Sequence, residues 1–338
     1  MESNPNLRQF LIALVSAFML FIPYEYYFRN VEAWPKSQDI ESVDLWAQCR
    51  SKVKHLSSDD IIILGSSRAH FDINIHLWKD VTGQRPLMLA YPGSSPFHTV
   101  DDIVNNTDFN GLLIVGVSPG LFFTVADSWG AGRGKKLIDY YNDATYAQRF
   151  SAFLYQQIKP HFASIGPDMS YESLIERIQL PNRDSVSAPD IWPPMVSMDK
   201  FRNVRMTPQM ETDTVLQRRQ TDIWDWPVWK NRYADSIDVI LKHYVDLFQK
   251  HKEKGGEVFL IRPPVTGNYL KYEPQLYPRE KYWDVLLDSA GVKGFHFMDN
   301  PETNAMVPPE WSHLSRKDSD RFTEILINLL REEELIKN

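Results

Sequence analysis

The sequence predicts an α/β fold built on a doubly wound, flavodoxin-like sheet of five parallel strands. Two observations predict it. Short, continuously apolar runs end in turn residues, as buried parallel strands do, and amphipathic helical patterns lie between these runs. The predicted strands are Asp60–Ser67, Arg85–Gly93, Gly111–Gly120, Glu257–Pro264 and Gly294–Asn300.

The helices between these strands are predicted from their period and their capping residues. The stretch Ile73–Gly83 ends in a glycine, which is the usual residue after a helix C-terminus. Ser95 is placed to cap a helix with Pro96 at its first position. Three longer helices follow in the second half of the chain, at Arg232–Gly256, Pro278–Gly291 and Ser315–Leu335.

The region between the third and fourth strands has no clean period and predicts an insertion, either a lid or a surface for a partner. Helical patterns are expected within it at Tyr146–Ile158 and Met169–Ile178. The glycine-rich stretch Gly130–Lys136 fails the spacing of a phosphate-binding loop, so we expect a mobile basic loop there. The resulting plan is an anchor over 1–30, a connecting segment over 31–58, an insertion over 121–232, and two halves of one domain over 59–120 and 233–338.

The composition excludes several classes of protein. The chain has 338 residues, is 43% hydrophobic and carries a formal net charge of −7, which is typical of a folded domain and unfavourable for nucleic-acid binding. A single cysteine, Cys49, allows no internal disulfide, and we expect it to be structural. His70 and His76 lack partners at metal-ligand spacing, so neither a metal nor a cofactor is predicted.

The N-terminal stretch Gln9–Tyr24 carries no charge and would span about 24 Å as a helix. The aromatic segment Glu25–Phe28 lengthens it and resembles an interfacial belt. No small-residue cleavage site follows, so an uncleaved membrane anchor is predicted, with a buried core helix as the alternative. Arg8 and Arg29 flank the stretch on both sides and leave its orientation undetermined.

Polar side chains gather where the predicted strands end, and ligands bind at that edge of such sheets. We expect Ser67 to be a nucleophile, His313 its base, and Glu310 the group that orients the imidazole. Asp299 is an alternative to Glu310. The competing interpretation is that Ser67 caps a helix and His313 is an ordinary surface residue.

A reaction through an acyl-serine also needs donors for a developing oxyanion. The backbone N–H groups of Ser67 and Gly93 are the candidates, although Gly93 could instead serve a turn with positive φ. Arg68 and Arg262 are candidates for binding an anionic substrate. Burying Arg262 at a strand end would otherwise require a carboxylate partner, for which Glu310 is one possibility.

This order of residues resembles the SGNH, or GDSL, hydrolase superfamily. Gly65–Ser67 resembles its first block with Ser66 in place of aspartate, Gly93 its second, and Glu310–His313 its last, with glutamate in place of aspartate. The third block, Gly-x-Asn-Asp, is not matched. Ser118 or Pro119 stands where its asparagine donor would be.

The combination of Gly-Ser-Ser-Arg, an N-terminal anchor and a carboxylate-x-x-His ending is similar to a membrane-anchored subset of that superfamily. The subset includes the teichoic-acid D-alanylation and alginate-acetylation proteins. The resemblance implies an acyltransferase that moves an acyl group, expected to be acetyl, onto an extracytoplasmic polysaccharide beside a membrane-bound O-acyltransferase. It also implies a single-pass protein of the inner (cytoplasmic) membrane with its globular domain in the periplasm or another extracytoplasmic space.

Two other functions stay open. The same triad would make an esterase if water were the acceptor, and a chain that kept only the fold would be a non-catalytic assembly partner. The tryptophan-rich stretch Trp224–Trp229 is compatible with a sugar-binding platform, and packing of the insertion is its simpler interpretation.

Overall fold

The structure is a computed structural model that describes residues 6–30, 41–124, 128–162, 195–224 and 237–337. The predicted helix Met169–Ile178 and most of the stretch Trp224–Trp229 lie outside these residues. The described residues of 1–40 and 147–193 form one compact unit, and those of 41–146 and 194–338 form a second.

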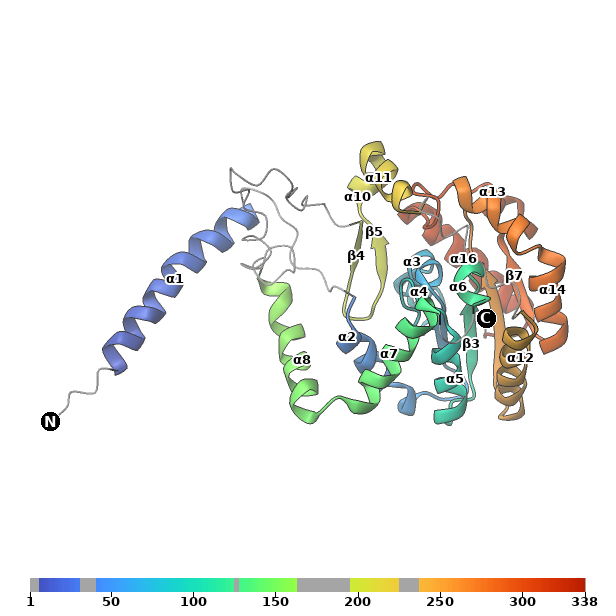
Figure 1. Ribbon diagram of the computed structural model, residues 1–338, viewed down its shortest axis with the longest axis horizontal. Helices are drawn as coiled ribbons and strands as arrows, with labels where there is room; N and C mark the ends of the chain where they lie inside the picture. Colours follow the sequence, from blue (N-terminus) through green and yellow to red (C-terminus); the bar gives the residue numbers. More distant parts are fainter. Residues whose placement is uncertain (1–5, 31–40, 125–127, 163–194, 225–236, 338) are drawn as a thin grey trace. The chain divides into compact units, whose positions relative to one another are not determined.

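The second unit is built on a five-stranded, wholly parallel sheet (Figure 1). The strand order is β2-β1-β3-β6-β7, which matches the predicted flavodoxin-like order because the chain reverses direction across the sheet after β2. The five strands are β1 (Ile61–Leu64), β2 (Leu87–Met88), β3 (Leu112–Gly116), β6 (Glu257–Arg262) and β7 (Lys293–His296).

Both faces of the sheet are covered by helices, as a doubly wound fold requires. Side chains alternate along β1, so Ile62 and Leu64 belong to one apolar core and Ile61 and Ile63 to the other. The first core includes residues of α2 (Val43–Arg50), α5 (Phe97–Asn106), α12 (Ile237–Glu253) and α14 (Arg279–Ala290). The second core includes residues of α3 (Ser67–Asp72), α4 (Ile75–Thr82) and α16 (Arg316–Glu332).

The predicted helix ends are confirmed where a capping residue marks them. Gly83 follows α4 with φ of 80°, and Gly291 follows α14 with φ of 59°. The Ser315 hydroxyl accepts a hydrogen bond from the Asp318 N–H at the start of α16. The start of α5 differs from the prediction: Ser95 accepts from the Phe97 N–H, and the helix begins only at Phe97.

The expected mobile loop over Gly130–Lys136 is wrong. These residues lie in α7 (Trp129–Asp143), where Gly130 and Gly134 are buried. A Cβ atom on Gly134 would lie 3.1 Å from the Ser95 carbonyl oxygen, and one on Gly130 would lie 2.8 Å from the Leu121 side chain. The two glycines are one helical turn apart, so they form the face on which α7 approaches the chain after β2.

Several short elements were not predicted from the sequence. An antiparallel hairpin of β4 (Val196–Met198) and β5 (Val204–Met206) is tied to the sheet by Arg202, which donates to the carbonyl oxygens of Met88 and Ala90 at 2.7 and 2.6 Å. The others are η1 (Val53–His55), α6 (Pro119–Phe122), η2 (Lys159–His161), α10 (Pro208–Thr212), α11 (Thr214–Trp224), α13 (Gly267–Leu276), η7 (Phe297–Asp299) and α15 (Pro301–Asn304).

The first unit contains α1 (Asn6–Asn30) and residues of α8 (Tyr146–Ile158). Within α1, the 21 residues Leu7–Tyr27 are long and apolar enough to cross a membrane, and none of the helix window that qualifies is buried. At 1.5 Å per residue the segment reaches about 32 Å, close to the thickness of a hydrocarbon core. The alternative of a buried core helix does not agree with this exposure.

Candidate active site

The turn between β1 and α3 places Ser67 at the carboxyl edge of the sheet. Gly65 has φ of 141°, a conformation that glycine adopts most easily. A Cβ atom on Gly116, at the end of β3, would lie only 2.5 Å from the Cβ of Ala69. These glycines let α3 rest directly on the ends of β1 and β3. Ser67 is the first residue of α3 and therefore stands where the strand order reverses.

The two serines of this turn have different surroundings. Ser66 is 1% exposed, and its hydroxyl lies 2.5 Å from that of Ser118. Ser67 is only partly buried, and its hydroxyl has no hydrogen-bond partner among the described residues. Ser67 is thus the hydroxyl left without a partner in the described structure, and Ser66 is engaged in the fold.

The loop before α16 holds a carboxylate and an imidazole side by side. Oε1 of Glu310 lies 2.7 Å from Nδ1 of His313 and also accepts the His313 backbone N–H at 2.6 Å. Both side chains are fully buried. Because an ionised carboxylate only accepts, Nδ1 carries the proton and Nε2 is left as the acceptor. Nε2 is buried and has no partner in the described structure, so the ring has the tautomer of a general base.

Three contacts fix this loop to the helix that begins at Ser67. The Arg68 Nε lies 3.3 Å from the Ser312 hydroxyl, and the Leu314 N–H donates to Asp72 at 2.8 Å. Between them, the Phe71 ring packs on the His313 ring at 4.4 Å between centroids. Phe71 and Ser67 are four residues apart and share a helix face. No hydrogen bond joins Ser67 to His313 in the described structure, and such contacts often tighten only with substrate.

Trp224 is a third side chain that contacts the Glu310–His313 pair. Its indole N–H donates to Oε2 of Glu310 at 2.6 Å, so both carboxylate oxygens of Glu310 have partners. The ring lies 6.1 Å from that of His313 and 6.4 Å from that of Tyr269. The described tryptophan of the sequence stretch therefore packs on the candidate site and orients Glu310. Its sequence neighbours 225–229 lie outside the described residues.

Arg68 and Arg262 share one buried carboxylate. Arg68 forms a fork with Glu273 at 3.1 and 2.8 Å, and Arg262 donates to the same group at 2.9 Å. The partner is thus Glu273 on α13, not Glu310, and no signal in the sequence distinguished it. Burial lowers the pKa of Arg262 to about 10, so its charge persists at neutral pH. Arg68 also lies 4.4 Å over the Tyr269 ring, whose pKa burial raises to about 12.

The expected oxyanion donors occupy the same edge of the sheet. Gly93 has φ of 66°, so its turn does require a positive φ. Neither the Gly93 N–H nor the Ser67 N–H donates to another described residue. The Ser118 hydroxyl shares its hydrogen bond with Ser66 and keeps a free proton only when Ser66 is the donor. The alternative orienting group, Asp299, forms an ion pair with Arg279 instead.

Asp72 is a buried acid that the sequence analysis missed. Burial, with the nearby charge of Glu310, raises its pKa well above the ordinary value. The carboxyl accepts the Leu314 N–H through Oδ1, while Oδ2 has no partner among the described residues. Asp72 therefore supports the histidine loop, and its raised pKa favours the uncharged form of its carboxyl.

The described residues contain no group of three or more histidine, cysteine, aspartate or glutamate side chains that could hold a metal ion. His76 pairs with Asp199, and Nε2 of His70 lies 2.9 Å from the Arg202 carbonyl oxygen. Cys49 is buried in the first apolar core. All three side chains thus have structural surroundings.

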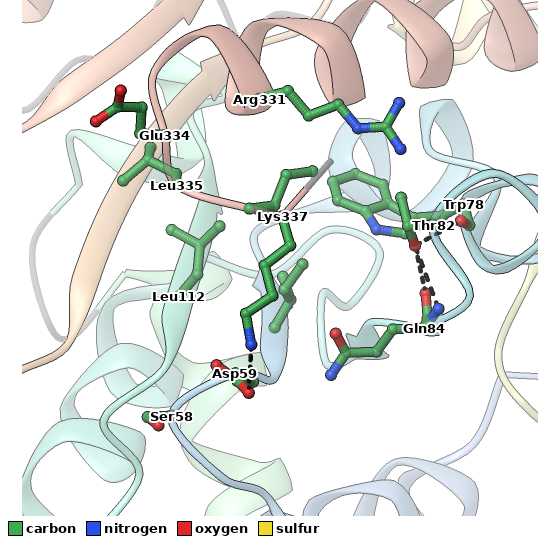
Figure 2. Close-up of a pocket in the computed structure, with 12 residues that line it drawn as sticks. Ser58, Asp59, Trp78, Thr82, Gln84, Leu112, Arg331, Glu334, Leu335 and Lys337 are labelled. Atoms are coloured by element: carbon green, nitrogen blue, oxygen red, sulfur yellow. Dashed lines mark hydrogen bonds and ion pairs between the residues drawn. The ribbon is translucent and has the colours of Figure 1, made fainter.

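A pocket of about 640 Å³ opens at the other end of the sheet, beside Ile61 and Leu112, the first residues of β1 and β3 (Figure 2). Figure 2 shows Lys337 reaching across it to Asp59, where the ion pair measures 2.8 Å. This pocket lies at the amino ends of the strands and is separate from the Glu310–His313 pair.

No protein-family model matches this chain, and no curated protein is similar enough to count as a match. The functional argument therefore depends on the site itself.

Proposed function

We propose that this protein is a membrane-anchored, SGNH-like acyltransferase that uses Ser67, His313 and Glu310 to move an acyl group onto an extracytoplasmic polysaccharide. The observation that carries the proposal is the buried Glu310–His313 pair, whose Nε2 has no partner among the described residues, on a loop fixed to the helix that Ser67 begins. An unpartnered ring nitrogen alone would not carry the proposal, because His243 and His251 also leave one buried ring nitrogen without a partner. What distinguishes His313 is the Glu310 carboxylate on its Nδ1 and its place on a loop bonded to the helix of Ser67.

The reaction has two balanced halves. His313 Nε2 takes the Ser67 proton as the serine oxygen attacks the acyl carbonyl, and the leaving group departs with that proton. A sugar hydroxyl then gives its proton to Nε2 and attacks the acyl-serine, and Nε2 passes that proton to the Ser67 oxygen as it leaves. Glu310 stabilises the imidazolium in both halves, because its Oε1 already holds the Nδ1 proton.

The negative oxygen that forms in each half needs donors already in place. The N–H groups of Ser67 and Gly93 are free of partners in the described structure, and Ser118 supplies a third donor when Ser66 donates to it. Ser118 takes the place of the asparagine that the resemblance leads one to expect. This substitution favours transfer within an assembly over efficient stand-alone hydrolysis.

The setting of the reaction follows from α1 and the resemblance. The exposed apolar segment Leu7–Tyr27 supports a single-pass anchor. The extracytoplasmic location of the sheet domain is proposed from the resemblance alone. Acetyl is the proposed acyl group, and a membrane-bound O-acyltransferase is the proposed partner. Two alternatives are an esterase with the same triad and a non-catalytic assembly partner.

Product analysis separates these functions. Full-length protein in detergent is given an activated acetyl ester with and without a polysaccharide acceptor, and Ser67→Ala is the matched control. Transferase activity predicts Ser67-dependent acetyl groups on the glycan in excess of free acetate. Free acetate alone would indicate the esterase, and turnover equal to that of Ser67→Ala would contradict both enzymes and leave the assembly partner.

A further inference from the structure

Helix α8 exposes an apolar face that no described part of the chain covers. Spacings of three and four residues place Phe150, Phe153, Leu154 and Ile158 on one side of the helix. These side chains are 63%, 52%, 42% and 46% exposed. Gln148 and Arg149 lie off this stripe. The stripe is rich in aromatic and aliphatic residues and long enough to be an interaction surface, because single exposed hydrophobic residues would not repeat at helical spacing.

The end of α8 is attached to the membrane-spanning helix. Phe162 follows α8 and η2, and its ring lies 5.4 Å from the ring of Phe21 in α1. Phe21 is inside the segment Leu7–Tyr27, six residues before its end. At 1.5 Å per residue, this contact lies about 9 Å inside the end of the segment. Helices that lie in a membrane surface bury their apolar face to a depth of about 5–10 Å.

We propose that α8 lies in the surface of the bilayer crossed by α1, with its apolar stripe against the acyl chains. The inference rests on the proposed anchor. We favour a lipid surface over a protein partner because of the Phe21–Phe162 contact. It places the chain just after α8 against α1, whose own apolar surface is exposed.

The consequence for function is a second attachment to the membrane. A single spanning helix fixes only the start of the chain, at residue 30. A surface helix at 146–158 fixes a second point, between β3 and β6 of the sheet domain. The chain would then contact the membrane at two points, one before β1 and one after β3 in the sequence.

The test uses an environment-sensitive dye on single cysteines in the full-length protein. Native Cys49 is buried and leaves the introduced cysteine as the reactive one. The variant Leu154→Cys probes the stripe, Gln148→Cys is the matched control on the opposite face, and Val15→Cys reports on α1. Each labelled protein is placed in nanodiscs of phosphatidylcholine and phosphatidylglycerol, with and without brominated acyl chains.

The proposal predicts a blue-shifted dye that brominated lipid quenches at positions 15 and 154, and an unshifted, unquenched dye at 148. Quenching at 15 with a water-like dye at 154 would overturn the surface helix and keep the anchor. A blue-shifted dye at 154 that brominated lipid does not quench would show that protein covers the stripe, which also overturns the proposal. No quenching at 15 would overturn the anchor and the surface helix together.

Discussion

Oε1 of Glu310 accepts both the Nδ1 proton and the backbone N–H of His313, at 2.7 and 2.6 Å. This double acceptance fixes the ring in orientation and in tautomer, because the backbone bond holds the carboxylate in place while the side-chain bond holds the proton. The opposite nitrogen, Nε2, is left to act as a base. The remaining oxygen of Glu310 is held by Trp224.

Replacing Glu310 by glutamine tests this role. Both carboxylate oxygens accept from N–H groups, so an amide leaves at least one of those donors facing its NH₂ and disturbs the arrangement. The neutral amide also no longer stabilises the imidazolium that forms when Nε2 takes a proton. We expect Ser67-dependent acyl transfer to fall by about 10²–10⁴, as loss of the orienting carboxylate does in serine proteases. Trp224→Phe, which removes only the indole N–H, should have a much smaller effect. Equal turnover in wild type and Glu310→Gln would remove Glu310 from the mechanism.

The paired hydroxyls of Ser66 and Ser118 give a second prediction. Ser118→Ala deletes a proposed oxyanion donor and should lower the acylation rate by about 10²–10³. Ser66→Ala leaves the Ser118 hydroxyl in place with its proton available, so its effect should be smaller. Acylation rates measured with an activated ester compare the two. A larger loss in Ser66→Ala than in Ser118→Ala would contradict the proposal. It would mean that Ser66 is the oxyanion donor or the nucleophile.

Glu273 should matter for stability more than any exposed acid. Removing its charge leaves the buried guanidinium groups of Arg68 and Arg262 without a counterion, which typically costs about 3–5 kcal/mol. We therefore expect Glu273→Gln to lower the denaturant midpoint clearly. Glu280→Gln, at an exposed position of the next helix, should change stability by less than about 0.5 kcal/mol. Similar midpoints for the two variants would argue against the buried cluster.

Asp72 predicts a specific dependence of stability on pH. Its pKa is raised in the folded protein, so the folded state keeps a proton that the unfolded chain loses above about pH 4. The stability linked to that proton is complete at low pH and is lost as pH rises toward the folded pKa. Asp72→Asn has no such proton and still accepts the Leu314 N–H.

The unfolding free energy of Asp72→Asn should therefore exceed that of wild type by a margin that grows as the pH rises above about 4, toward the raised folded pKa of Asp72. Denaturant titrations of both proteins at several pH values measure the margin. A margin that stays constant across this range, or shrinks toward neutral pH, would mean that Asp72 is ionised in the folded protein.

The sheet could be predicted because its central strands, β1, β3 and β6, are buried on both faces and are therefore almost continuously apolar. Ile61–Leu64 and Val258–Ile261 show this directly. The strand ends were harder to place. Glycines at 65 and 116 end their strands by allowing a helix to approach, and Gly130 and Gly134 have the same role inside α7. A glycine that permits close packing and a glycine in a mobile loop look alike in sequence.

The pairing of Glu310 with His313 could be predicted because both residues belong to one short segment. The site residues that distant segments contribute, Glu273 and Trp224, could not be paired with their partners from the sequence. Glu273 is an acid within an unremarkable helical stretch, and only the fold brings it to Arg68, 205 residues earlier. Trp224 was noticed for its aromatic neighbours, yet its bond to Glu310 depends on a helix whose place the sequence did not indicate.

The most direct test of the central claim is the rate at which a fluorophosphonate modifies Ser67 in wild type and in His313→Gln. The account predicts a single adduct, located on Ser67 by peptide mass spectrometry. It also predicts a modification rate that falls by about 10²–10⁴ when the general base is removed. An adduct on Ser66, or a Ser67 adduct that forms equally fast in both proteins, would contradict the account.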